Sequence, residues 1–166
     1  MILIFAVDKN WNIGYGGKML ADIPSDLKRF RQLTEGHIVI MGRKTLEAIP
    51  GQGPLPNRIN IVFTRDKNFN REGFYILNNM DELFPLLERI NPKGEKEVFV
   101  TGGGTIVRQL LPHCNRAYIT KILKSFDRAD TSIPNLDLDE SWKIVKESEI
   151  QRENGLEYKY VDYIRK

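Results

Sequence analysis

The sequence predicts an α/β fold with a mixed, mainly parallel central sheet, flanking helices and a C-terminal antiparallel hairpin. Two observations lead to this prediction. Residues 2–7 form an unbroken apolar run of strand length, which is typical of a strand buried on both faces. Strand-like and helix-like segments then alternate, and Asn154-Gly155 separates two final stretches of alternating polarity, which indicates a β-hairpin.

The other elements follow from apolar runs for strands and from 3.6-residue spacing for helices. After the first strand, residues 8–22 form a long glycine-containing loop, whose aromatic and apolar content favours a lid that packs on the protein. Pro24 then opens a helix over residues 23–34, because proline is tolerated in a first turn. The remaining predicted elements are strand 37–41, a short helix over 42–49, strands 59–64 and 74–77, helix 81–90, strand 97–100, helix 105–111, strand 116–123, and hairpin strands 142–150 and 156–164.

Length and charge place limits on the class of protein. The chain has 166 residues, which fits one domain over residues 1–166 around a single core. Its net charge of +3 comes from 25 basic and 22 acidic side chains that are well interspersed, so no charged run suggests a nucleic-acid-binding tail. A small positive surplus suits an anionic small-molecule ligand.

The sequence also indicates a compartment. The apolar run at residues 2–7 is far shorter than the ~20 residues of a membrane span and lacks the flanks of a signal peptide. Cys114 is the only cysteine, which excludes an internal disulfide and fits a reducing environment. We therefore expect a cytoplasmic protein without a membrane segment, and a monomer by default.

Asp26 points most directly to chemistry. On the helix opened by Pro24, Leu27, Phe30 and Leu33 share one stripe about 120° wide. Asp26 lies inside this stripe, roughly 20° from Leu33 and 40° from Phe30. Burial of a carboxylate among apolar side chains costs several kcal/mol unless a partner repays it, and it raises the pKa toward the range of a useful acid. The alternative is a first-turn aspartate that satisfies helix N–H groups.

Three junctions at strand ends carry residues suited to a phosphate-bearing ligand, and ligands of α/β sheets bind at such places. Residues 102–104 are three glycines before a helix, which allow close backbone approach and expose helix N–H groups. Arg43 and Lys44 stand at a second helix start, and Thr64-Arg65 ends a third strand. Each junction alone is also explained by a structural turn or by solvated charges. Together they suit an extended dinucleotide with an extra phosphate.

Arg58 follows the rigid turn 54–57 and is placed to present a bidentate fork to a carboxylate, the alternative being an ordinary surface arginine. His37 and His113 are far apart and lack metal-ligand spacing, so we predict no metal site. Trp142 and the tyrosines at 158, 160 and 163 are expected to pack in the sheet rather than to stack on bases.

These segments together resemble dihydrofolate reductase over nearly the whole chain. No single motif is decisive, but their order and spacing are highly specific. The residues that carry the resemblance are Ala6-Val7, Ile13-Gly14, Met19, Ile23 to Leu27 with Phe30, Val39 to Arg43 with Thr45, Pro54 to Arg58, Thr64-Arg65, Gly102 to Gly104, Tyr118 to Thr120, and Asp130-Thr131. The resemblance implies NADPH-dependent reduction of 7,8-dihydrofolate to tetrahydrofolate, which supplies one-carbon metabolism.

The resemblance also implies a substrate site. Asp26 would bond the pterin and promote protonation of N5, and Thr120 would join Asp26 through a bridging water. Arg58 would hold the glutamate α-carboxylate, while Ile4 and Thr101 would offer backbone carbonyls. The implied substrate-binding residues are Ile4, Phe5, Ala6, Asp26, Leu27, Phe30, Ile49, Leu55, Arg58, Thr101 and Thr120, and the implied catalytic residues are Asp26 and Thr120.

The implied NADPH site covers the three junctions and the lid. Arg43, Thr64 and Arg65 would take the 2′-phosphate, and Thr45 with Gly102 to Gly104 would hold the nicotinamide and pyrophosphate half. Residues 8–22 would close over the nicotinamide. The implied cofactor-binding residues are Ala6, Ile13, Gly14, Met19, Gly42, Arg43, Lys44, Thr45, Thr64, Arg65, Thr101, Gly102, Gly103, Gly104, Thr105 and Ile106.

The sequence departs from the family at two places. Leu20-Ala21 follows Met19 where members usually have Pro-Trp, so packing and an indole N–H beside Asp26 are lost. Val107 stands where many members have tyrosine, so an aromatic ring near the nicotinamide is lost. Both changes bear on turnover rate, lid closure and antifolate affinity, but neither touches Asp26 or the phosphate ligands. We expect an active enzyme that is slower than relatives with the tryptophan.

Three other functions are also considered. The nearest is another NADPH-dependent pterin or pyrimidine reductase of the same fold, such as the reductase of riboflavin synthesis, but Arg58 and Phe30 fit a folate tail. A nucleic-acid-binding module is suggested by the basic isoelectric point, yet it does not explain a buried acid. The missing tryptophan raises an inactive folate binder as the last alternative.

Overall fold

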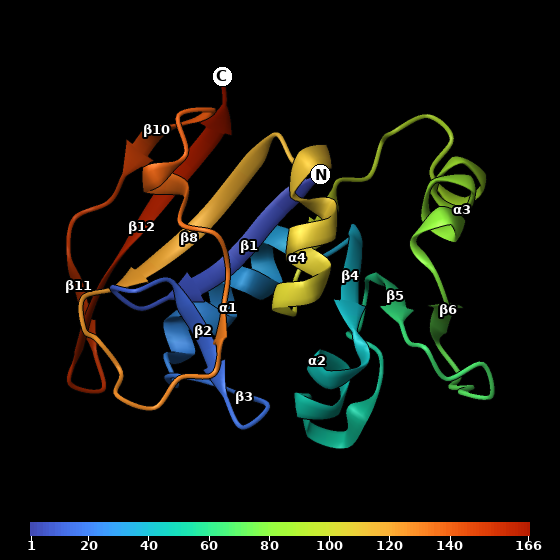
Figure 1. Ribbon diagram of the computed structural model, residues 1–166, viewed down its shortest axis with the longest axis horizontal. Helices are drawn as coiled ribbons and strands as arrows, with labels where there is room; N and C mark the ends of the chain where they lie inside the picture. The colour runs from blue at the N-terminus through green and yellow to red at the C-terminus, as the bar shows by residue number, and fades with distance from the viewer.

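The apolar run Ile2–Val7 forms β1, an inner strand of a nine-stranded sheet in the computed structural model, which describes residues 1–166 (Figure 1). β1 pairs in parallel with β7 (Val98–Val100) and β8 (Arg116–Ile122). The order of the strands is β10-β12-β8-β1-β7-β4-β5-β6. β4 (Ile38–Gly42), β5 (Ile59–Phe63) and β6 (Phe74–Leu77) continue the parallel part, as the sequence predicts.

The C-terminal strands form the antiparallel part. β12 (Leu156–Arg165) runs antiparallel to β8, to β10 (Trp142–Glu147) and to β11 (Gln151–Glu153). The predicted hairpin is confirmed, since Asn154 and Gly155 both have the positive φ angles, 52° and 73°, that tight hairpin turns require. The single strand expected over 142–150 is instead divided into β10 and β11.

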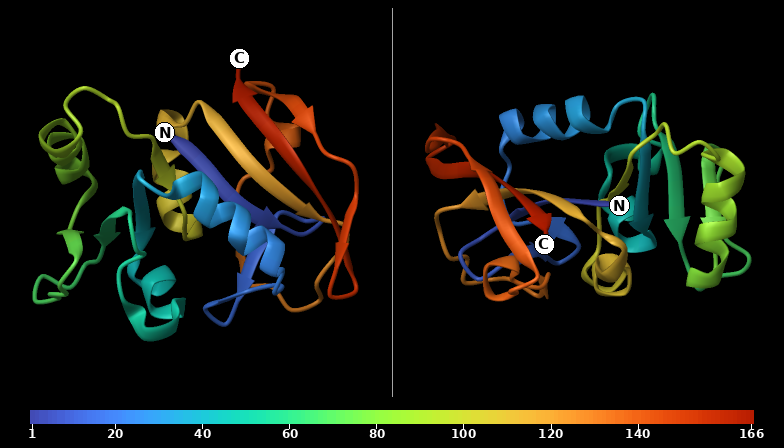
Figure 2. Two further views of the ribbon diagram at one scale, coloured as in Figure 1. Left: turned by 180° about the vertical axis from the view of Figure 1, so that it is seen from behind. Right: turned by 90° about the horizontal axis from the view of Figure 1, so that it is seen from above.

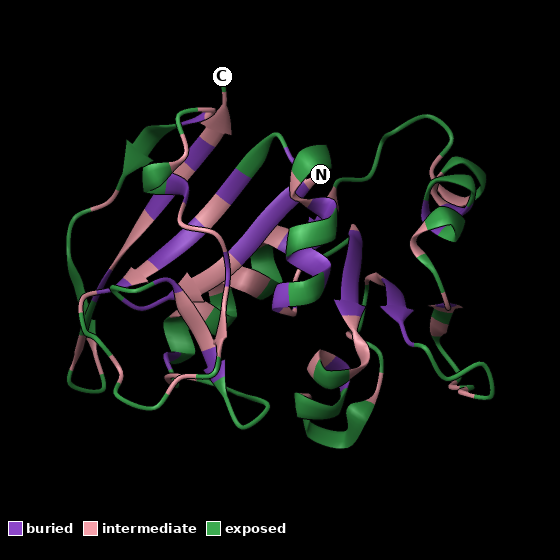
Figure 3. Cartoon of the chain, viewed as in Figure 1, coloured by how far each residue is buried: buried purple, intermediate pink, exposed green.

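Helices cover both faces of the sheet. Phe30 and Leu33 of α1 (Pro24–Thr34) and Leu46 of α2 (Arg43–Ala48) pack against one face, while Leu83 of α3 (Leu83–Ile90) and Leu110 of α4 (Gly104–Leu110) belong to the core on the other. Figure 2 shows α1 and α4 on opposite sides of the strands. Buried residues are concentrated on the inner strands between these helices (Figure 3). No helix is long and apolar enough to cross a membrane.

Short 3₁₀ turns extend or follow several helices, and they explain why some predicted bounds differ by a few residues. η1 (Pro50–Gln52) follows α2, η2 (Met80–Glu82) precedes α3 and η3 (Leu111–His113) follows α4, whereas η4 (Leu136–Leu138) stands alone before β10. The helix expected over 81–90 is thus a 3₁₀ turn followed by α3. The predicted helix that Pro24 opens is confirmed to end at Thr34.

Residues 8–22 are not the irregular loop that we expected. They contain β2 (Asn12–Tyr15) and β3 (Lys18–Met19), which form a second, three-stranded sheet with β9 (Thr131–Ser132). The buried Asp8 carboxylate fixes the base of this hairpin by accepting hydrogen bonds from backbone N–H groups on both sides, including that of Phe126 at 3.1 Å. The glycines of this segment hide the alternation by which strands are recognised.

Candidate active site

Asp26 lies in the first turn of α1 and faces β8. The hydroxyl of Thr120 donates to Asp26 Oδ1 at 2.6 Å. The contact is direct, so the bridging water that we expected between the two side chains is not needed. Asp26 also does not cap the helix, because α1 begins without a side-chain cap. The structure therefore favours the placement of this carboxyl on the apolar side of α1 over the capping alternative.

The surroundings of Asp26 raise its pKa above the usual aspartate range. Burial is the main cause, since a carboxylate loses solvation when apolar groups replace water. The Thr120 hydrogen bond and the positive charge of Arg29 oppose this effect, because both stabilise the ionised form. Burial outweighs them, and the group is easier to protonate than an ordinary aspartate.

Most of the expected apolar wall beside Asp26 is assembled on the same face of the sheet. Phe30, Ile49 and Leu55 are half-buried and pack on one cluster with the buried Ile4. Leu27 is 43% exposed, so it borders the site without packing into the core. Phe5 differs, because its side chain packs on the core at the opposite face of the sheet, away from Asp26.

Two further predicted groups lie near this wall. Ala6 is directly beside Thr120 in the register of β1 and β8, and Thr120 is in turn beside Tyr160 of β12. Thr101 uses both its N–H and its hydroxyl to bond Ile40 O, each at 2.9 Å, and no residue donates to its own carbonyl oxygen. That oxygen is free to accept a hydrogen bond from a ligand.

Arg58 is held in place but has no carboxylate partner. Its Nε donates to Pro56 O at 2.9 Å, and Nη1 donates to the buried Thr34 hydroxyl at 3.2 Å. Burial lowers the pKa of the guanidinium from its usual value, although Arg58 stays charged at neutral pH. Its remaining Nη2 group has no protein acceptor. The alternative of an ordinary solvated arginine does not fit a side chain fixed at two points, whereas a carboxylate ligand does.

The glycine junction and the Arg43 junction meet at one edge of the sheet. Gly42 N donates to Gly102 O at 2.9 Å. A Cβ on Gly102 would lie 2.7 Å from Thr45 Oγ1, and a Cβ on Gly104 would lie 2.7 Å from Ser132 O, so these glycines are required for close packing. Gly103 is different, because a Cβ there would meet only Thr45 Oγ1 at 3.9 Å.

The open side of Gly103 and the free N–H groups at the start of α4 fit a cofactor phosphate. Thr105 is exposed in this turn, and Ile106 packs with its Cγ1 3.4 Å from the Cβ position of Gly42. The structure thus brings together the residues of two junctions that we expected to bind one dinucleotide.

Arg43 is less free than the sequence suggests. Its Nε bonds Glu47 at 3.0 Å, its Nη1 bonds Asp66 at 3.1 Å, and its guanidinium lies 4.4 Å from the Phe69 ring centre. Thr64 Oγ1 is also engaged, since it accepts from Asp66 N at 3.2 Å. Lys44 and Arg65 are both exposed and form no ion pair. These two cations are the ones immediately available to a 2′-phosphate.

The hairpin over residues 12–19 carries the expected lid residues. Ile13 packs on the core, whereas Met19 is 60% exposed. Gly14 has no room for a side chain, because a Cβ would lie 2.9 Å from Lys18 O. Asp130 ties the hairpin down, because its backbone N–H donates to Gly14 O and its carboxylate accepts from Gly16 N, each at 3.0 Å.

The two departures from the family pattern have different surroundings. Ala21 is half-buried in a cluster with Ile23 and Tyr160. Val107 is fully buried in the main core, so its side chain contributes packing rather than an exposed surface beside a ligand.

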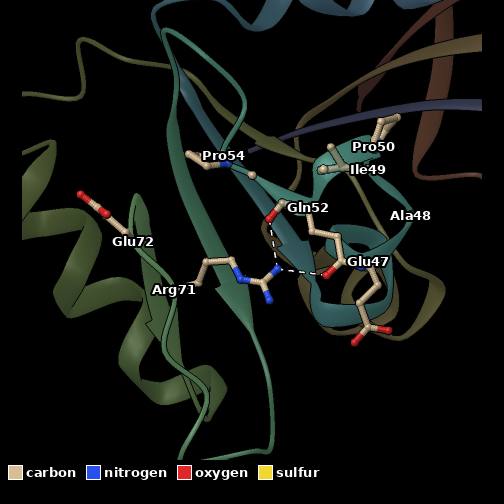
Figure 4. Close-up of a pocket in the computed structure, with 10 residues that line it drawn as sticks. Glu47, Ala48, Ile49, Pro50, Gln52, Pro54, Arg71 and Glu72 are labelled. Atoms are coloured by element: carbon tan, nitrogen blue, oxygen red, sulfur yellow. Dashed lines mark hydrogen bonds between the residues drawn. The ribbon is translucent and has the colours of Figure 1, made fainter.

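A groove of about 670 Å³ lies beside α2 and η1 and is lined by residues 47–54, 71 and 72, so that it shares Ile49 with the apolar wall (Figure 4). Arg71 crosses it and donates to both the backbone and the side-chain oxygen of Gln52 at 3.1 Å. The charged groups of the groove are Arg71, Glu72 and Glu47, and the last of these also pairs with Arg43. It does not include Asp26 and is therefore not the candidate site.

No group of three or more His, Cys, Asp or Glu side chains is arranged to hold a metal ion. His37 Nδ1 accepts a hydrogen bond from Glu97 N at 2.9 Å, which is a structural role. Burial raises the pKa of the Cys114 thiol to about 11, so Cys114 is a packing residue rather than a nucleophile.

Comparison with known proteins matches this architecture. The family model described as dihydrofolate reductase matches residues 1–165. The chain belongs to the dihydrofolate reductase family. Its relatives include the dihydrofolate reductase of Bacillus subtilis (strain 168), 34% identical over 165 residues, which cover 98% of this chain and 93% of the relative. That of Staphylococcus haemolyticus is 37% identical over 162 residues, with coverage of 98% and 92%.

A solved structure of a family member is also similar. The dihydrofolate reductase of Enterococcus faecalis, complexed with NADP(H) and RAB-propyl, aligns with a TM-score of 0.82 at 30% identity. The alignment covers 99% of this chain and 95% of that protein. The sequence and the fold therefore agree on the family.

Sequence reasoning assigned no role to three charged groups of the site. Asp66 neutralises Arg43, Asp130 holds the hairpin over residues 12–19, and Arg29 lies beside the Asp26 contact. Arg29 could have been noticed, because it stands one turn after Asp26 on α1. The other two depend on contacts between distant segments, and local patterns do not reveal them.

Proposed function

We propose that the protein reduces 7,8-dihydrofolate to tetrahydrofolate with NADPH, and that Asp26 is the acid that assists protonation of N5. Membership of the dihydrofolate reductase family supports the overall reaction. The observation that carries the role of Asp26 is its protonation-prone carboxyl, bonded to Thr120 at the edge of an apolar wall. NADPH, when bound, supplies the hydride.

The chain's own residues supply binding, orientation and the proton. Asp26 hydrogen-bonds the pterin and, in its protonated form, favours proton delivery to N5, directly or through water. Thr120 fixes the direction of that carboxyl. Phe30, Ile49 and Leu55 exclude water from one side of the substrate, which strengthens the polar contacts that remain.

Arg58 binds the glutamate α-carboxylate in this proposal. Its unused Nη2 and its two protein hydrogen bonds support the role, because a fixed guanidinium recognises a carboxylate at small entropic cost. The carboxylate that Arg58 binds in this proposal distinguishes dihydrofolate from the pterins and pyrimidines that lack a glutamate tail.

Cofactor binding is assigned to two regions. Residues 102–106 with Thr45 would hold the pyrophosphate and nicotinamide half, and the open face of Gly103 supports this assignment. Lys44 and Arg65 would meet the 2′-phosphate first, with Thr64 beside them. Arg43 would join only when the phosphate competes with the Asp66 carboxylate for its guanidinium.

We also propose that the enzyme is a single-domain cytoplasmic monomer that does not bind nucleic acid. Interspersed charges and a single buried cysteine support this, because they suit neither a polyanion surface nor an oxidising compartment. Size-exclusion chromatography with light scattering tests the monomer, and a dimer mass at micromolar concentration would refute it.

Loss of NADPH absorbance on addition of dihydrofolate tests the function. We expect rapid oxidation with dihydrofolate and little with a pyrimidine substrate of the related reductases. Oxidation with the pyrimidine alone would instead support the related reductase. NADPH and dihydrofolate binding without turnover would support the inactive folate binder.

A further inference from the structure

Arg29 lies one turn after Asp26 on α1 and faces the same strands, β8 and β12. Its Nη2 is 3.5 Å from Asp162 Oδ1, and both side chains are largely shielded, with 24% and 21% exposed. Its guanidinium carbon lies 4.1 Å from the centre of the Tyr160 ring and 5.8 Å from that of Tyr118. A cation in this position is held by charge, by aromatic faces and by the sheet itself.

The register of the sheet places the Arg29 cage beside the Asp26 contact. Tyr160 is opposite Thr120, which bonds Asp26, and Asp162 is opposite Tyr118. Because alternate residues of a strand share a face, the four side chains of β8 and β12 all point toward α1. One face of α1 therefore places Asp26 against the pair Thr120 and Tyr160 and places Arg29 against the neighbouring pair Tyr118 and Asp162.

We propose that Arg29 is a positioning residue that acts on the reaction through Asp26, and that its pairing with Asp162 sets how much positive charge Asp26 experiences. This inference rests on the proposed role of Asp26 as the acid. The Arg29 charge favours the ionised carboxyl, while the Asp162 charge cancels part of that effect. The pair thus sets the upper pH at which Asp26 still carries its proton.

The charges of Arg29 and Asp162 change the pKa of Asp26 in opposite directions, so their effects can be distinguished. Burial raises the pKa of Asp26, and Arg29 lowers it. Removal of Arg29 therefore raises the pKa of Asp26 further. Removal of the Asp162 charge leaves Arg29 uncompensated and removes a nearby anion, so the pKa of Asp26 falls. A purely structural role for the pair predicts no such opposite shifts.

Other ionisable groups also lie on the elements next to Asp26. They are Tyr158 and Tyr160 on β12, Tyr118 and Arg116 on β8, Glu153 on β11 and the exposed Asp22 before α1. Burial raises the pKa of Tyr160 to about 12, so its phenol is neutral at neutral pH. Arg116 donates to Tyr118 OH at 3.2 Å, and Glu153 accepts from Ser25 N at 3.2 Å.

The test measures the Asp26 titration directly in the ligand-free protein, by carbon-13 NMR of its carboxyl. We expect Arg29→Met to raise the titration midpoint by about half a pH unit to one unit, and Asp162→Asn to lower it by a similar amount. Lys28→Met is the matched control, because it removes one positive charge from the exposed face of the same helix. It should leave the midpoint in place.

The pH profile of turnover provides the second readout. The alkaline limb should move upward for Arg29→Met, downward for Asp162→Asn and little for Arg29→Lys, which retains the charge. Midpoints that do not move, or that move in the same direction in Arg29→Met and Asp162→Asn, would overturn the inference. If Arg29→Met does not fold, Asp162→Asn must still lower the midpoint.

Failure of the proposed function gives a different result. If Asp26→Asn were as active as the wild type at every pH, Asp26 would not be the acid. The NMR midpoints of Arg29→Met and Asp162→Asn would still report whether the pair controls the Asp26 carboxyl.

Discussion

Thr120 Oγ1 and Asp26 Oδ1 are 2.6 Å apart, although 94 positions separate the two residues in the chain. The hydrogen bond joins the first turn of α1 to the centre of β8, and it fixes the carboxyl while burial raises its pKa. A carboxyl whose direction is fixed and whose pKa is raised above the usual aspartate range is suited to general acid catalysis.

Arg58→Leu should raise the KM for dihydrofolate by about 10- to 100-fold with a small change in kcat, because hydrogen bonds to a charged group contribute about 1.5–3 kcal/mol. Steady-state kinetics measure this. Arg58→Lys keeps the positive charge but loses the bidentate geometry of the guanidinium, so its KM should lie between those of the wild type and Arg58→Leu. An unchanged KM in Arg58→Leu would remove Arg58 from the substrate site.

Gly102→Ala and Gly103→Ala should separate folding from cofactor binding. Gly102 has a φ of 144° and lacks space beside Thr45, so alanine there should destabilise the fold by about 1–3 kcal/mol. Gly103 has an ordinary φ of −89° and open space, so alanine should leave the unfolding temperature nearly unchanged but weaken NADPH binding. Thermal unfolding and NADPH fluorescence titration distinguish them. Unaltered NADPH affinity in Gly103→Ala would argue against the proposed phosphate cradle.

Asp130→Asn should loosen the lid hairpin, because a charged acceptor of the Gly16 N–H is replaced by a neutral one. We expect kcat/KM to fall by about tenfold, since a hydrogen bond to a charged group contributes about 1.5–3 kcal/mol. Asp127→Asn is the control, because this exposed carboxylate of the same connection forms no hydrogen bond. Equal kinetics in the two variants would show that the Asp130 contact does not affect the lid.

Asp26→Asn should raise the thermal unfolding temperature at neutral pH. The pKa of Asp26 is raised in the folded state, so the folded protein binds this proton more tightly than the unfolded chain does. Stability therefore falls as the pH rises above the pKa that Asp26 has in the unfolded chain. Asparagine removes this cost while its oxygen still accepts from Thr120. The gain in unfolding temperature should shrink as the pH falls below the usual aspartate range. A loss of stability at neutral pH would contradict the burial effect.

Local patterns in the sequence were sufficient for much of the fold. The apolar run of β1, the proline that opens α1 and the Asn154-Gly155 turn all have short-range physical causes, and the structure confirms them. The hairpin over residues 12–19 was not recognised because glycines interrupt its alternation. Its pairing with β9, more than a hundred residues later, is settled only by the tertiary fold.

The candidate site shows the same division. The position of Asp26 in an apolar stripe could be predicted from helical spacing. The Thr120 partner of Asp26 was implied by the resemblance to a family and not by any local pattern. The pairing of Arg29 with Asp162 and the neutralisation of Arg43 by Asp66 could not be predicted, because each joins segments whose proximity depends on strand order. Charge partners across a sheet are therefore the part of such a site that requires a structure.

The pH dependence of hydride transfer from NADPH to dihydrofolate, compared between the wild type and Asp26→Asn, tests the role of Asp26 most directly. We predict a wild-type rate that falls as the pH rises through the raised pKa of Asp26. The variant should be slower by a factor on the order of 10²–10⁴ at neutral pH, with a smaller difference in acid, where solvent protons reach N5. A variant that matches the wild-type rate and keeps its alkaline limb would contradict the assignment of Asp26 as the acid.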